Sequence, residues 1–129
     1  MTGQRFQLVR QCDGQVLLPE LKLAVSYWSR LAGLQFQRQL KPQQGLWLAP
    51  CSSLHTCFMR FPIDVVMLDA QQVVVGCKRK LRPWRICICP RGTKAVVETA
   101  VGAIEVAVGD RLEIDCRPEG GKGVRNHFD

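Results

Sequence analysis

The stretch Cys51-Ser-Ser-Leu-His55-Thr-Cys-Phe-Met59-Arg60-Phe-Pro62-Ile-Asp64-Val-Val-Met-Leu-Asp69 concentrates a thiol, an imidazole, a thioether, a guanidinium and a carboxylate in one short passage. Residues 54–59 alternate as the two faces of a strand do. Phe61-Pro62 requires an extended or turned backbone, and residues 63–68 form an apolar run that predicts a second strand. Residues 69–72 then predict a hairpin turn. The stretch is therefore a strand–turn–strand unit, which indicates a β architecture.

Short apolar segments continue on both sides of this unit. They predict further strands at residues 6–12, 16–18, 22–25, 46–48, 73–80, 86–89, 94–99 and 111–116. One short helix is expected over residues 26–32, where Ser26 caps its start and Gly33 ends it. We expect a mainly β domain, a compact antiparallel β sandwich or barrel with this one helix in its N-terminal half.

Length and composition favour a single domain. The 129 residues are 47% hydrophobic and 22% charged, as is ordinary for a globular protein. We expect residues 1–116 to form one β-rich domain, and residues 117–129, with three glycines and a proline, to form a flexible C-terminal tail. No apolar run is long enough to cross a bilayer, and the N-terminal residues lack the apolar core of a signal peptide. The expected location is the cytoplasm.

The seven cysteines are expected to be free thiols, because their number is odd and their spacing is not that of a disulfide scaffold. Cys51, His55 and Cys57 lack the spacing of paired zinc ligands, and the apolar neighbours of Cys87 and Cys89 favour packing over coordination. We therefore expect neither a metal site nor a cofactor.

The net charge of +7 comes from one region. Seven basic residues and no acidic residue lie between Asp69 and Glu98, whereas the rest of the chain carries eleven of each sign. The seven are Lys78, Arg79, Lys80, Arg82, Arg85, Arg91 and Lys94. Such a patch attracts anions over long range. The alternative is an edge strand that its positive charges protect from aggregation.

A binding surface is the leading functional hypothesis. Arg82-Pro-Trp-Arg85 places a tryptophan between two cations, the residue types that anchor interfaces. The alternative is a core tryptophan with its flanking charges in solvent. Together with Met59 and Arg60, Trp84 and Arg85 are the predicted ligand-binding residues of a non-catalytic accessory module. Its predicted partner is an anionic small molecule or an acidic protein. Nucleic acid would also suit the charge, but no nucleic-acid-binding motif accompanies it.

An enzyme is the alternative hypothesis. Cys51 would be the nucleophile, His55 its base and Asp64 the residue that orients the base. The competing interpretation of Asp64 is structural: a carboxylate after Pro62 accepts backbone N–H bonds or pairs with Arg60.

Several segments, in order, resemble domain-of-unknown-function family 192. Residues 45–69 resemble its core signature, an aromatic–methionine pair followed by a proline, an aspartate and an apolar strand that ends in an aspartate turn. Residues 29–34 are similar to its upstream Arg-x-x-Gly-Leu segment, although Gln35 stands where the family usually has methionine. Glu98 and residues 108–111 resemble its closing segment. The resemblance covers about residues 21–114 and implies a small β-rich, sandwich-like fold with no established activity. It also implies that many relatives carry an export signal.

Overall fold

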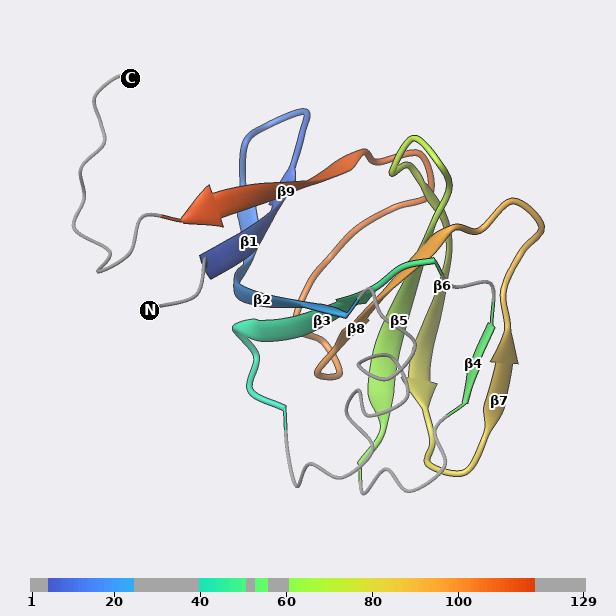
Figure 1. The fold of residues 1–129 in the computed structure, drawn as a ribbon. Coiled ribbons are helices and arrows are strands. Elements are labelled where there is room, and N and C mark those ends of the chain that lie inside the picture. The colour runs from blue at the N-terminus through green and yellow to red at the C-terminus, as the bar shows by residue number, and fades with distance from the viewer. Residues whose placement is uncertain (1–4, 25–39, 51–52, 56–60, 118–129) are drawn as a thin grey trace, which may run out of the picture.

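The computed structural model describes residues 5–24, 40–50, 53–55 and 61–117, and within these ranges it contains nine strands and no helix (Figure 1). The strands are β1 (Arg5–Arg10), β2 (Val16–Ala24), β3 (Gln44–Leu48), β4 (Ser53–His55), β5 (Ile63–Leu68), β6 (Val74–Leu81), β7 (Ile86–Ile88), β8 (Ala95–Thr99) and β9 (Leu112–Arg117). The prediction of a mainly β fold is confirmed.

Seven of these strands form one sheet, in the order β6-β5-β8-β3-β2-β1-β9, and β4 pairs with β7 in a separate two-stranded ribbon. All pairs are antiparallel except β2 and β3, which are parallel. A parallel pair needs a long crossover, and 19 residues separate Ala24 from Gln44. The expected antiparallel sandwich or barrel was wrong in this respect, because strand pairing across such a crossover leaves no local signal in the sequence.

The sheet is open, yet its two edge strands approach each other at one end. Val73, just before β6, bridges Arg111, just before β9. Two backbone bonds reinforce this contact: Val74 N–H donates to the Asp110 carbonyl at 2.8 Å, and Leu112 N–H donates to the Gln72 carbonyl at 3.0 Å. The twist of the strands curls the sheet far enough for its edges to touch there.

Two apolar clusters lie on the two faces of the sheet. The inner cluster joins strands from both ends of the sheet and therefore fills the curl. It contains Leu8, Leu18, Leu21, Trp47, Val66, Leu68, Val74, Ala95, Val97, Ile104 and Leu112. The outer cluster, on the opposite face, contains Leu46, Leu48, Ile63, Val65, Met67, Leu81, Cys87 and Val96. β5 and β8 are buried on both faces, which explains their continuous apolar sequences.

The β4–β7 ribbon packs on the outer cluster. Cys87 is buried there, and Pro90 follows β7 and packs on Gly76 of β6. A Cβ on Gly76 would lie only 3.2 Å from Pro90 Cγ, so the glycine permits the close approach.

The hairpin predicted at residues 69–72 is present. Asp69 Oδ1 accepts the N–H of Gln71 at 2.9 Å and of Val73 at 3.0 Å, the local bonding that makes aspartate a turn residue. The helix expected over residues 26–32 lies outside the described residues. The same holds for the tail expected over residues 117–129, except for Arg117, which is the last residue of β9. Within the described part of the chain, no helix is long and apolar enough to span a membrane.

Candidate functional site

The β7 surface is the most distinctive exposed region of the described chain. Ile86 and Ile88 are 75% and 83% exposed, whereas Cys87 between them is buried in the outer cluster. This alternation directs one face of β7 to the core and the other to water. Arginines lie at both ends of the strand. We define the β7 surface by the exposed residues Arg82, Trp84, Arg85, Ile86, Ile88 and Arg91.

Trp84 occupies a strained position on this surface. It follows Pro83 in the turn between β6 and β7, with a φ of 63°, and its side chain is 58% exposed. Proline followed by a positive φ is the pattern of a type II turn, which normally carries glycine or asparagine at the second position. A left-handed conformation costs an L-residue about 1–2 kcal/mol. The chain therefore bears strain in order to hold a large aromatic ring largely in water.

The seven basic residues of this region divide into two groups. Lys78, Arg79 and Lys80 are exposed on β6, an edge strand of the large sheet, where positive charge opposes edge-to-edge pairing. The other four lie in the segments before and after β7, and three of these, Arg82, Arg85 and Arg91, belong to the β7 surface. Edge protection thus accounts for Lys78 and Lys80, whereas Arg79 is ion-paired with Asp64. The second group lies beyond this edge strand.

Asp64 is a buried polar centre on the other face of the sheet. It is 2% exposed, and its Oδ1 accepts the Lys80 N–H at 2.9 Å. Its Oδ2 accepts the Gly102 N–H at 2.9 Å and a bond from Arg79 Nη1 at 2.8 Å. Burial raises the pKa of Asp64, but the bonds from Gly102, Lys80 and Arg79 outweigh it, so the pKa lies below its ordinary value. Asp64 is therefore held as an anion that joins β5, β6 and the segment after β8.

The sheet separates Asp64 from the ribbon that contains His55. Asp64 alternates with Ile63 and Val65 of the outer cluster, so it faces the inner side, whereas the ribbon packs on the outer side through Cys87. His55 is described by its backbone, which pairs with Ile86. Cys51 lies outside the described residues. The pairing of Cys51 with His55 stays a prediction, and Asp64 is placed where it does not reach the ribbon.

Of the predicted ligand-binding residues, Trp84 and Arg85 are exposed side by side in the sequence at the start of β7. Met59 and Arg60 lie outside the described residues, so their place beside Trp84 stays a prediction. No cluster of three or more potential metal ligands occurs among the described side chains.

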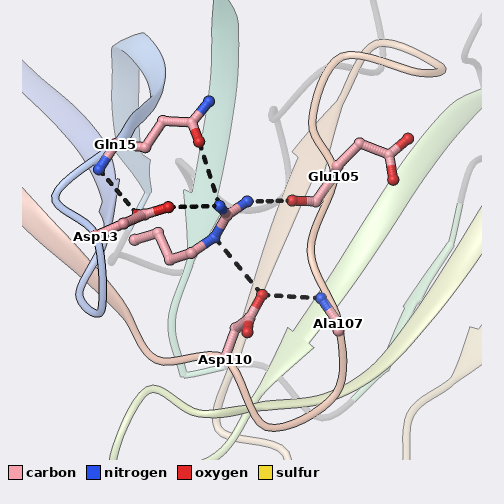
Figure 2. A network of polar contacts seen from close by, with 6 residues as sticks. Asp13, Gln15, Glu105, Ala107 and Asp110 are labelled. Atoms are coloured by element: carbon pink, nitrogen blue, oxygen red, sulfur yellow. Dashed lines mark hydrogen bonds and ion pairs between the residues drawn. The ribbon is translucent and has the colours of Figure 1, made fainter.

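A second polar network ties the β1–β2 turn to the segment before β9 (Figure 2). Arg10 Nη1 donates to Asp13 Oδ2 at 3.0 Å and to Gln15 Oε1 at 3.2 Å, and Nη2 donates to the Glu105 carbonyl. Its Nε lies 3.6 Å from Asp110 Oδ2, close enough for an ion pair but too far for a hydrogen bond. These contacts are all internal, and we interpret the network as structural.

Comparison with known proteins supplies the family. The pattern of the DUF192 family, described as Uncharacterized ACR, matches residues 9–114. The chain belongs to the DUF192 family. A UPF0127 protein of Thermococcus sibiricus is 30% identical over 120 residues, which are 87% of this chain and 77% of the relative. A UPF0127 protein of Pyrococcus furiosus is 37% identical over 109 residues, 78% of this chain and 90% of the relative.

Two solved structures share the fold of this DUF192 chain. One is a Sinorhizobium meliloti protein described as a candidate transcription regulator, with a TM-score of 0.70 and 24% identity over 85% of this chain and 92% of the other. The other is a Novosphingobium aromaticivorans protein of unknown function, with a TM-score of 0.72 and 18% identity over 84% of this chain and 83% of the other. At these identities the likeness concerns the fold alone.

Sequence reasoning did not include Glu98 of this DUF192 domain among the candidate site residues. Glu98 lies on β8 between Leu46 of β3 and Val65 of β5, on the face of the outer cluster, and is 5% exposed. Burial raises its pKa to about 7. The sequence did contain a sign of this burial, because an acidic residue interrupts the apolar run Ala95-Val-Val-Glu-Thr99. A central strand is covered on both faces, so the acidic residue is buried on whichever face it lies.

Proposed function

We propose that this DUF192 domain is a non-catalytic binding module that takes an anionic ligand or partner on the β7 surface, around Trp84 and Arg85. Met59 and Arg60 of the signature stretch are its predicted further contacts. The observation that carries the proposal is Trp84, an exposed indole held at positive φ between two arginines. Strained backbone positions cluster at ligand-binding sites, where the strain presents a side chain in a fixed position.

The charge around Trp84 sets the class of ligand. Arg82 and Arg85 flank the indole in sequence and Arg91 lies beyond β7, while no acidic residue occurs between Asp69 and Glu98. Arginine and tryptophan together give both electrostatic attraction and apolar contact area, the combination found at binding hot spots. The positive charge would attract an anionic ligand, and the apolar or planar parts of that ligand would cover the indole.

The test measures binding of fluorescein-labelled poly-L-glutamate by fluorescence anisotropy at about 0.1 M NaCl. Trp84→Gly should weaken binding at least fivefold, because it removes the indole without changing the net charge. The same variant should unfold at a temperature no lower than that of the wild type, because glycine relieves the positive φ.

A matched pair of charge variants serves as the control. Arg82→Ser with Arg85→Ser, and Arg5→Ser with Lys22→Ser, each remove two exposed positive charges. A localised site predicts a much larger loss for the first pair than for the second. Equal losses, together with unchanged binding by Trp84→Gly, would show a diffuse charge effect and refute the proposal.

A further inference from the structure

We propose that the partner is an extended acidic segment of another polypeptide, whose alternate apolar side chains dock on Ile86 and Ile88. This inference rests on the proposed function and narrows it from anions in general to one class of partner. Its basis is the exposure of Ile86 and Ile88, which neither the charge pattern nor the indole explains.

The chemistry of the isoleucines distinguishes the partner from other anions. A small inorganic anion gains nothing from aliphatic side chains. Single-stranded nucleic acid could stack a base on Trp84, but it would gain nothing further from Ile86 and Ile88, because β-branched aliphatic side chains do not form a stacking platform. A polypeptide with apolar side chains buries the surface of Ile86 and Ile88 favourably, and the gain grows with the area removed from water. The exposed pair therefore favours a protein ligand.

The spacing of the isoleucines favours an extended ligand. Ile86 and Ile88 are two residues apart on one face of β7, with Cys87 turned to the core. Alternate side chains of any extended chain repeat at about 6.6–6.8 Å. A segment with apolar residues at every second position therefore matches the pair when it lies along β7.

The arginines of the β7 surface determine which charge the partner segment should carry. Arg85 immediately precedes Ile86, and Arg91 follows Ile88 by three residues, so cations lie at both ends of the apolar pair. All of these side chains are exposed. An extended segment with acidic residues between and beyond its apolar ones complements both features at once. Like charge would exclude basic segments.

The test compares two fluorescein-labelled dodecapeptides, one of alternating glutamate and valine and one of alternating glutamate and serine. They carry the same charge and differ only in apolar surface. Fluorescence anisotropy at about 0.1 M NaCl should show that the protein binds the glutamate–valine peptide about tenfold more tightly or better, the gain expected from burying two aliphatic side chains. Ile86→Ser with Ile88→Ser should abolish this preference.

The matched control replaces two exposed valines elsewhere, Val16→Ser with Val108→Ser, and should keep the preference. Circular dichroism checks that each variant is folded. Equal affinity for the two peptides, or a preference that survives in the isoleucine variant, overturns the inference. If the wild type binds both peptides equally and Trp84→Gly weakens both, the proposed anionic site stands and the docking inference fails. If neither peptide binds, both fail.

Discussion

At the scale of single residues, two buried carboxyl groups have opposite electrostatic environments. Asp64 accepts three hydrogen bonds, one of them from Arg79, and its pKa is lowered. Glu98 lies among apolar neighbours on the opposite face, and burial raises its pKa to about 7. The first group stabilises the fold as an anion, whereas the second destabilises it when it is ionised.

Glu98 predicts a loss of stability as the pH rises. The unfolded chain releases its proton near pH 4.5 and the folded chain near pH 7, so between these values the folded state binds more protons. The free energy of unfolding should therefore fall by about 3 kcal/mol across this window. Urea unfolding at several pH values between 4.5 and 7.5 measures the slope.

The matched variant for this measurement is Glu98→Gln, which has no titrating group at the same position. Its stability should vary less with pH than that of the wild type. Because Asp64 has a lowered pKa, its contribution is lost only as the pH falls below the ordinary range of aspartate, so it does not affect this window. Identical slopes in the two proteins would mean that Glu98 is already ionised in the fold.

At the scale of elements, polar side chains fix the segment between β8 and β9, which has almost no regular structure. Asp64 accepts the Gly102 N–H, and Arg79, held by Asp64, donates to the Ile104 carbonyl at 3.3 Å. Arg10 holds the next part of the segment through the Glu105 carbonyl (Figure 2). The first set of contacts comes from β5 and β6 and the second from β1, so the segment is attached to both ends of the curled sheet.

Asp64→Ala should therefore lower the free energy of unfolding by about 3 kcal/mol or more. It leaves Arg79 without its anion and two backbone N–H groups without an acceptor. The exposed Asp115 of β9 provides a control, since Asp115→Ala should change stability by less than about 0.5 kcal/mol. Thermal and urea unfolding measure both variants. A loss of stability for Asp64→Ala as small as that for Asp115→Ala would contradict the role of Asp64 in fixing the segment between β8 and β9.

Elements whose identity depends on local pattern could be predicted from the sequence. The apolar run of β5 and the turn at Asp69 each have a local cause, namely burial on both faces and an aspartate that bonds its own backbone. The sequence did not decide whether Trp84 is exposed, because a core tryptophan was the competing interpretation. The parallel pairing of β2 with β3 could not be predicted, because it depends on a crossover. The ion pair of Asp64 with Arg79 could not be predicted either, because these residues are 15 apart in the sequence and meet only through the pairing of β5 with β6.

The candidate site was predictable to the same extent. Trp84 and Arg85 were predicted as ligand-binding residues because proline, tryptophan and arginine are adjacent in the sequence, and both are exposed in the structure. Ile86 and Ile88 were read as part of an apolar strand, Ile86-Cys-Ile-Cys89, and only the packing of Cys87 on the outer cluster reveals that they face water. Apolar content alone does not distinguish the covered face of a two-stranded ribbon from its open face.

At the scale of the whole molecule, the curled sheet encloses the inner cluster and carries the β4–β7 ribbon on its other face (Figure 1). Among the described side chains of β7, Cys87 packs on the core, and the β7 surface presents Trp84, two isoleucines and three arginines to solvent. We interpret the sheet as the scaffold and the ribbon as the part that meets a partner. On this interpretation, the positive charge of Lys78 and Lys80 protects the β6 edge, and the positive charge of the β7 surface attracts the partner.

Chemical-shift mapping of the ¹⁵N-labelled protein during titration with the glutamate–valine peptide tests this division most directly. The account predicts progressive shifts confined to the backbone amides of residues 82–91, of their β4 partners at residues 53–55 and of the predicted contacts Met59 and Arg60. The amides of β1 and β9, on the far side of the sheet, should stay unchanged. Shifts spread evenly over every exposed basic segment, or centred on β1 and β9, would contradict the assignment of binding to β7.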